Sequence, residues 1–255
     1  MFEPDNEPFY PKLQPIIDSA FEHQWLPEKA IDWQLEVKLP DGIDQRTYID
    51  MVSQLYYAEE ATIQLLGRML QEVPELHAKQ YLCTQAMDEA RHAQVYRSYL
   101  ARLGDIAPIN DGLRYVLDSG LSWRGSHCGL VVALNVVMEG EALRQQQKRI
   151  ETLPCPLFRA INTAIIRDES RHAKFGRIYT TQTLASVALD DKVAIYRWIK
   201  QIWSLWERAN QGRYHVDGAD ILRTESSELQ QRLALQQQLF TQIGLFDENN
   251  RSAYN

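Results

Sequence analysis

The amino-acid sequence predicts an all-α protein built around a four-helix bundle. Hydrophobic residues recur with a helical period over long stretches, strand-like alternation is scarce, and the 12 glycines and 10 prolines fall mainly between those stretches. Hydrophobic residues make up 45% of the 255 residues and charged residues 24%, as in ordinary soluble globular proteins, which argues against a disordered chain. We expect one domain over residues 1–255.

The predicted helices follow a proline-containing N-terminal arm, residues 1–43, which carries one short helix around 12–24. Pro74 suits the first turn of the second long helix, and Gly104 suits a stop after its end. The four long helices are expected at 44–72, 75–103, 122–150 and 155–186. Two accessory helices, 189–211 and 225–243, are expected outside the bundle in the C-terminal part, 187–255.

The lengths of the connections predict how these helices are arranged. Short links join the first long helix to the second and the third to the fourth, so each pair is expected to be antiparallel. Residues 104–121 connect the two pairs, and 18 residues can span at most about 60 Å, the length of a long helix or more. The sequence therefore predicts two helical hairpins joined by one long crossover, with the bundle at about 44–186.

An internal repeat of 80 residues carries the functional signal. DEARHAQVYRSYL at 88–100 and DESRHAKFGRIYT at 168–180 share Asp, Glu, Arg, His, Ala, Arg and Tyr in register. The same offset relates Glu59 to Glu139, so each half reads Glu, thirty residues, then Glu-x-x-His. Fewer than one Glu-x-x-His match is expected by chance in a chain with six histidines, so the doubled pattern indicates a built site.

The hydrophobic pattern selects the upstream glutamate in each half. Glu59 shares its helix face with apolar residues such as Val52 and Leu66, whereas Glu60 shares its face with polar or small residues. Glu139 is likewise flanked by apolar residues, whereas Glu141 leads to charged and amide side chains. Glu59 and Glu139 are therefore the predicted inward-facing residues.

Four helices then bring four carboxylates and two imidazoles together, a donor set typical of a pair of iron or manganese ions in a bundle core. The predicted ligands, which are also the predicted catalytic residues, are Glu59, Glu89, His92, Glu139, Glu169 and His172. Four carboxylates in an apolar core repel one another, and two divalent cations balance their charge.

The residues beside the ligands suggest supporting roles. Asp88 and Asp168 can accept the second ring N–H of a histidine across the bundle, with Asp88 facing His172 and Asp168 facing His92. Arg91 and Arg171 stand three residues after each aspartate, where they can neutralise it. The other histidines, His23, His77, His127 and His215, are expected to be structural or exposed.

The doubled Asp-Glu-x-Arg-His motif resembles that of the ferritin-like di-iron carboxylate oxidases and oxygenases. It looks like the motif of bacterial multicomponent monooxygenase hydroxylases and acyl-carrier-protein desaturases, and is similar to that of p-aminobenzoate N-oxygenases. The resemblance implies a ferritin-like bundle holding two iron ions, with Mn/Fe as the alternative pair. It implies that the reduced pair binds O₂ and that a small-molecule or carrier-bound substrate undergoes hydroxylation, N-oxygenation or desaturation.

Alternatives within the same superfamily stay open. Tyr96 lies four residues after His92, where the radical-generating subunit of ribonucleotide reductase bears its radical tyrosine, although a core tyrosine is favoured. A ferroxidase or iron storage protein is a further alternative, but storage members usually lack the Arg between Glu and His. The hydroxylases have a threonine four residues after the third-helix glutamate, whereas this chain has Leu143.

Charge and cysteine content predict the surroundings in which the protein works. A net charge of −7 speaks against general attraction to nucleic acid, and no apolar run reaches 18 residues, so no membrane partner is expected. The acidic, proline-containing N-terminus does not resemble a charged-then-apolar secretory signal, which favours a cytoplasmic location. The three cysteines, Cys83, Cys128 and Cys155, show no disulfide or metal spacing and are expected to be core or surface thiols. Electrons must then come from an external reductase or ferredoxin, and a homodimer is compatible with the pattern.

The tryptophans of 198–206 are expected to pack between outer helices, with a cofactor box as the lesser alternative.

Overall fold

The computed structural model of the protein describes residues 11–210 and 226–254, apart from the side chains of 206–210, 226–230 and 233. All regular structure in these residues is helical. The bundle consists of α3 (Gln45–Glu72), α4 (Leu76–Leu103), the segment α6 (His127–Val131), η1 (Val132–Met138) and α7 (Glu139–Thr152), and α8 (Pro156–Thr183). These bounds lie close to the predicted ones, except at the start of the third helix.

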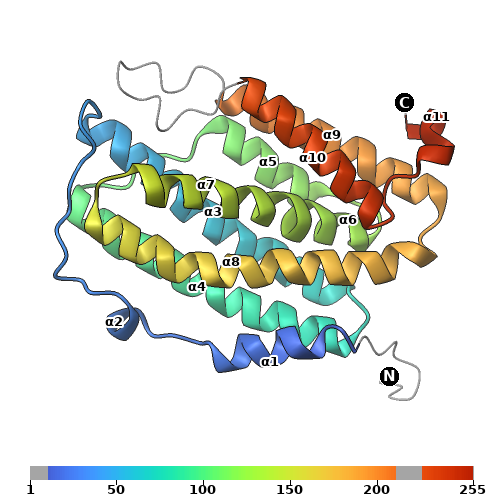
Figure 1. The fold of residues 1–255 in the computed structure, drawn as a ribbon, viewed down its shortest axis with the longest axis horizontal. Coiled ribbons are helices and arrows are strands. Elements are labelled where there is room, and N and C mark those ends of the chain that lie inside the picture. The colour runs from blue at the N-terminus through green and yellow to red at the C-terminus, as the bar shows by residue number, and fades with distance from the viewer. Residues whose placement is uncertain (1–10, 211–225, 255) are drawn as a thin grey trace.

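The bundle is made of two antiparallel hairpins that pack on each other (Figure 1). α3 pairs with α4, α7 pairs with α8, and α4 contacts α8 in the middle of the bundle. Local chemistry sets the helix ends: the side chain of Asp44 accepts a 3.0 Å hydrogen bond from the backbone N–H of Thr47, and Pro156 occupies the first turn of α8. Gly104 ends α4 with φ of 146°, a backbone conformation that favours glycine.

The third bundle helix differs from the prediction of one helix over 122–150. Asn110 caps an additional helix, α5 (Asp111–Ser122), within the crossover, by accepting a 2.7 Å bond from the backbone N–H of Leu113. The helix ends at Ser122, and α6 begins after Ser126, whose side chain caps it. A π-helical turn, η1, follows directly and leads into α7 at Glu139. Hydrophobic periodicity reveals neither the interruption between two helices nor a change from α- to π-helix. The predicted start of the third bundle helix at residue 122 was therefore wrong.

Helices from both ends of the chain cover the bundle. α9 (Leu189–Asn210) packs on α5, where Trp198 stacks on Trp123 with ring centroids 4.2 Å apart and donates a 3.0 Å bond to Ser119 Oγ. Trp203 is also buried, so this part of the stretch serves core packing; the side chain of Trp206 lies outside the described residues.

The other outer elements are short or lie along the surface of the bundle. α1 (Gln14–Glu22) crosses α4 and α8, and α10 (Ser226–Gln242) runs along the outside near α9 (Figure 1). The remaining short helices are α2 (Pro27–Ala30), η2 (Leu184–Ser186), η4 (Glu248–Asn250) and α11 (Arg251–Tyr254).

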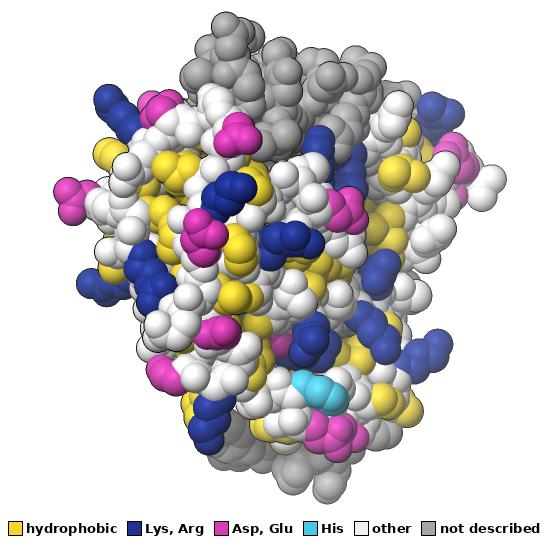
Figure 2. Space-filling view, turned by 60° about the vertical axis from the view of Figure 1, so that its left-hand side comes forward, with side chains coloured by type: hydrophobic (Ala, Val, Ile, Leu, Met, Phe, Trp, Pro, Cys, Tyr) yellow, Lys and Arg dark blue, Asp and Glu magenta, His cyan; other side chains and the backbone are white. Residues whose placement is uncertain are grey.

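The surface is mixed in character. On the face shown in Figure 2, basic and acidic side chains are interspersed, and hydrophobic side chains form small groups between them. Within the described ranges, no helix combines the length and the apolar character needed to cross a membrane.

Candidate metal centre

The structure brings all six predicted ligand residues to one place in the bundle core. Each of the four bundle helices contributes: α3 and the start of α7 one glutamate each, α4 and α8 one glutamate and one histidine each. The exposed fractions are 7% or less: Glu59 7%, Glu139 5%, Glu89 and Glu169 1%, His92 and His172 0%. Glu60 is exposed, so the inward choice of Glu59 agrees with the structure.

Two of the glutamates face both histidines. Glu89 places Oε2 3.2 Å from Nδ1 of His92 and Oε1 3.2 Å from Nδ1 of His172. Glu169 does the same with its two oxygens, each at 3.3 Å. The imidazole centroids lie 6.2 Å apart, so both carboxylates bridge the space between them.

The other two glutamates each lie beside one histidine. Glu59 Oε2 is 3.7 Å from Nδ1 of His92, and Glu139 Oε1 is 3.9 Å from Nδ1 of His172. The result is two overlapping groups of potential ligands, in which Glu89 takes part in both. Glu59, Glu89, His92 and Glu169 form the first group, and Glu89, Glu139 and His172 form the second.

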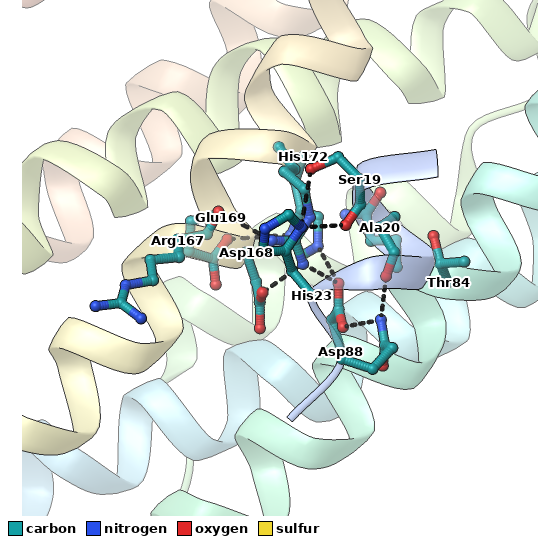
Figure 3. Close-up of polar contacts among 12 residues, drawn as sticks. Ser19, Ala20, His23, Thr84, Asp88, Arg167, Asp168, Glu169 and His172 are labelled. Carbon is teal, nitrogen blue, oxygen red and sulfur yellow. Dashed lines mark hydrogen bonds and ion pairs between the residues drawn. The ribbon is translucent and has the colours of Figure 1, made fainter. Parts of the chain in front are cut away.

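The second nitrogen of each histidine faces an aspartate from the opposite hairpin. Nε2 of His172 lies 3.2 Å from Asp88 Oδ2 (Figure 3). Nε2 of His92 lies 3.0 Å from Asp168 Oδ2, so both pairs are those expected from the sequence. These contacts leave Nδ1 of both rings directed at the glutamates, because the aspartates fix the ring orientation.

Two arginines cross-link the aspartates. Arg91 pairs with Asp88 on its own helix and lies 3.2 Å from Asp168, while Arg171 pairs with Asp168 and lies 3.2 Å from Asp88. All four side chains are at most 12% exposed. Two positive and two negative charges thus balance one another around the histidines, and this network ties α4 to α8.

The N-terminal arm covers this network, which the sequence did not indicate. Trp25 donates a 2.8 Å hydrogen bond from Nε1 to Asp168 Oδ2, and the guanidinium of Arg91 lies 4.6 Å from the Trp25 ring centre. Gln24 accepts a 2.8 Å bond from Arg91 and donates a 3.1 Å bond to Asp88. Figure 3 shows α1 crossing beside Asp88 and His172. Contacts between residues so far apart in sequence leave no periodic signal.

A second unpredicted pair supports the glutamates. Gln85, one turn before Glu89, donates bonds of 3.0 Å to Glu89 and 2.9 Å to Glu139. Asn135, in the π-helical turn η1, donates a 2.7 Å bond to the Gln85 side-chain oxygen. Both side chains are fully buried. The spacing of four between Gln85 and Glu89 is the one sequence signal that could have revealed this contact.

Burial and mutual proximity shift the pKa values of the site. Burial raises the pKa of Glu59 well above its usual range, and burial together with the charges of Glu169 and Glu89 does the same for Glu139. Burial opposes charge on Glu169 too, but hydrogen bonds from Glu139 and the two histidines lower its pKa. Against the effect of burial, the charge of Glu89 and bonds to Asp88 and Glu169 raise the pKa of His172 to about 10.

These shifts show that, without cations, protons take over part of the charge balance. Protonated histidines and protonated carboxyls compensate the buried carboxylates, and divalent cations would replace those protons. Carboxylate oxygens and imidazole nitrogens suit iron and manganese. The cluster therefore fits a dinuclear metal centre in number, type and arrangement of donors.

Among the other residues singled out from the sequence, Tyr96, His127 and Glu141 contact structural partners. Tyr96 is fully buried and donates a 2.8 Å bond to Asn162 Oδ1. His23 is exposed, His127 lies 3.2 Å from the Tyr179 hydroxyl, and His215 lies outside the described residues. Glu141, expected on the polar side of its helix, is instead buried against Arg232 of α10, since α10 covers that face.

The fold of this chain is similar to that of proteins of known structure, whereas its sequence matches no known family. No family model and no curated protein matches the sequence. The R2-like ligand-binding oxidase from Sulfolobus acidocaldarius aligns with a TM-score of 0.62 and 17% identity, covering 89% of this chain and 90% of that one. The fold is ferritin-like.

Two further structures give the same result. An R2-like ligand-binding oxidase mutant with an anaerobically reconstituted Mn/Fe cofactor aligns with a TM-score of 0.56 and 18% identity, over 92% of this chain and 85% of that one. The same kind of oxidase with an aerobically reconstituted Mn/Fe cofactor aligns with a TM-score of 0.54 and 18% identity, over 96% and 88%. At this identity the likeness establishes the fold, and the chemistry must be argued from the site itself.

Proposed function

We propose that this protein is an O₂-dependent oxidase or oxygenase that uses a dinuclear centre, Fe/Fe or Mn/Fe. The observation that carries the proposal is the pair Glu89 and Glu169, each of which presents one oxygen to each of two histidines. Two metal ions would be held by these residues, with Glu59 and His92 contributing to one position and Glu139 and His172 to the other. The Mn/Fe cofactors of the structurally similar oxidases support the same assignment.

The metal pair would supply the redox chemistry and the binding site for O₂. The chain's own residues would hold that pair and exclude water, because the proposed ligands are almost entirely buried and Asp88 and Asp168 fix the histidine rings. The side-chain amide of Gln85 donates hydrogen bonds to Glu89 and Glu139 and so fixes both carboxylates. The site is therefore preorganised for two ions by residues from every bundle helix.

An apolar cavity of about 40 Å³ lies between α3, η1, α5 and α9. Its lining includes Ala58, which directly precedes Glu59, Thr62, one helical turn further along α3, and Met138, which directly precedes Glu139. The cavity therefore adjoins the two turns that carry these glutamates. Its volume is enough for a few molecules of water size. An apolar space of this kind suits O₂ or the reacting part of an organic substrate.

We further propose a small-molecule or carrier-bound substrate, an external electron donor, and a reaction of the hydroxylation, N-oxygenation or desaturation type. The doubled Asp-Glu-x-Arg-His motif supports this, because it resembles that of O₂-activating enzymes. An oxidation that reduces O₂ requires electrons, and the sequence contains no cysteine cluster that would hold a redox centre for delivering them.

The test is rapid mixing of the anaerobic iron(II)-loaded protein with O₂, followed by absorption and electron paramagnetic resonance. We expect a transient absorption whose decay quickens with the right substrate. Glu59→Gln should abolish the transient, whereas the matched control Glu60→Gln should retain it, since Glu60 is exposed. Multi-turnover growth of a ferric mineral would overturn the proposal in favour of storage. A stable tyrosyl radical absent in Tyr96→Phe would favour the radical-generating subunit.

A further inference from the structure

A second cavity lies on the outer side of the bundle, where α10 covers the groove between α7 and α8. Its volume is about 210 Å³, about five times that of the apolar cavity between α3, η1, α5 and α9 at about 40 Å³. One wall is apolar and is formed by Val136, Val137, Leu143 and Leu239. The cavity thus offers space for an organic molecule of several carbons.

The lining also contains three arginines. Arg144 of α7, Arg177 of α8 and Arg232 of α10 line the cavity, and among the lining residues that the structure describes Glu141 is the one acidic residue. Three positive charges against one negative charge leave an excess of two positive charges. Such an excess in a partly enclosed cleft attracts anions.

The single carboxylate is already engaged. Glu141 lies 2.6 Å from Arg144 and also pairs with Arg232, and it accepts a 2.9 Å bond from Gln145. Arg177 is exposed and forms no ion pair within the described part of the chain. The guanidinium of Arg177, and the donors of Arg144 that Glu141 does not use, are therefore available to an incoming anion.

A buried amide points to the same use of the cavity. Gln236 lines it and is only 8% exposed, yet its Oε1 has no hydrogen-bond partner among the described residues. A buried acceptor without a partner is costly, and a bound molecule or water that donates a hydrogen bond removes that cost. This observation does not depend on the charge count.

We propose that this cavity binds a small organic anion, with its carboxylate or phosphate at Arg144 and Arg177 and its apolar body against Val136 and Leu143. The inner wall is formed by the helix turns that carry two of the proposed metal ligands, since Gly140 follows Glu139 and Ala173 follows His172. The site is built from side chains alone, so binding is expected in metal-free protein and does not depend on the proposed oxidase function.

The test is calorimetric titration of the full-length, metal-free protein with hexyl phosphate and, separately, with hexanoate. We expect one site per chain for at least one of the two, and the two probes distinguish a phosphate from a carboxylate ligand. The double variant Arg144→Gln/Arg177→Gln should bind about tenfold more weakly or worse, because charge-assisted hydrogen bonds are lost. Arg159→Gln is the matched control, since Arg159 is exposed on α8 outside the cavity lining.

Two further probes make the inference refutable. Inorganic phosphate tests the charge alone and hexanol tests the apolar body alone; both should bind at least tenfold more weakly than the matching amphiphilic anion. Equal binding of hexanol would contradict the role of the arginines, and equal binding of inorganic phosphate would contradict the role of the apolar wall. Equal loss of affinity in Arg159→Gln, or no binding of either anion, would overturn the proposal. Circular dichroism of each variant shows whether it is folded.

Discussion

At the scale of single residues, the site depends on which atom of each side chain faces which partner. Asp88 and Asp168 contact Nε2 of the two histidines, so Nδ1 of each ring faces the glutamates. Arg91 holds both aspartates at once, so ring orientation and charge balance are set by the same contacts. Replacing one aspartate should therefore disturb metal affinity rather than remove a ligand.

Asp168→Asn tests this supporting role. The amide keeps the shape of the side chain but loses the charge that orients His92, so the protein should still bind metal with an affinity about 10–100-fold lower. Anaerobic titration with iron(II) measures the change, with Asp118→Asn on the exposed face of α5 as the control. Unchanged affinity, or complete loss of one metal equivalent, would contradict a purely orienting role.

The pH dependence of metal-free protein follows from the raised pKa of His172. Its value is about 10 in the folded protein against 6.5 ordinarily, so the folded state binds one more proton than the unfolded state between these pH values. The contribution to stability is fully present below pH 6.5 and is lost as pH rises through about 10. Glu59 and Glu139, with pKa values raised by burial, act in the same direction.

We therefore expect the melting temperature of metal-free protein to fall from pH 7 to pH 10. Metal-loaded protein should show a smaller fall, because metal replaces the protons on these groups. Calorimetric melts of the two forms at matched ionic strength measure the difference. A metal-free melting temperature that rises with pH over this range would show that the sign is wrong.

At the scale of helices, the close contact between η1 and α8 positions Asn135, and through it Gln85 and two glutamates of the centre. A Cβ added at Gly176 would lie 2.5 Å from Asn135 Cβ and 2.7 Å from its backbone carbon, so only glycine permits this approach. Asn135 in turn holds Gln85, which holds Glu89 and Glu139. The π-helical turn thus transmits helix packing to the ligands.

Gly176→Ala tests that contact. The extra methyl group should push η1 from α8 and lower the free energy of unfolding by about 1–3 kcal/mol, with weaker metal binding. Gly67→Ala is the matched control, because a Cβ there meets nothing within 4 Å and should stabilise α3 by about 0.5–1 kcal/mol. Urea denaturation measures both. Equal effects of the two substitutions would show that the η1 contact is not important.

At the scale of the whole molecule, the repeat of 80 residues explains how much the sequence could reveal. A ligand pair three residues apart lies on one helix face, so Glu89 with His92 and Glu169 with His172 were predictable from spacing alone. The long helices and the crossover followed from periodicity and link lengths. The arm over Asp168 and the cover of α10 over Glu141 were not predictable, because they join segments 143 and 91 residues apart without any repeated pattern.

Bound metal should also increase the stability of the whole molecule. Loss of metal leaves the carboxylates of the core without their compensating cations, so metal-free protein should unfold more easily near pH 7. Mass action alone contributes about 2.7 kcal/mol when free metal is at 100 times its dissociation constant. Melting curves with and without iron(II) under anaerobic conditions measure this, and identical curves would contradict metal binding in the core.

The most direct test of the central claim is the number of metal ions that the folded chain binds. Anaerobic titration of metal-free protein with iron(II), followed by removal of excess metal and elemental analysis, should give two equivalents per chain. His92→Ala and Glu169→Ala should lower that number, because each removes a donor from the bundle core. If the native protein binds two equivalents and both variants bind fewer, the site is a dinuclear centre. Saturation of the native protein at one equivalent, or two equivalents that persist in both variants, would contradict it.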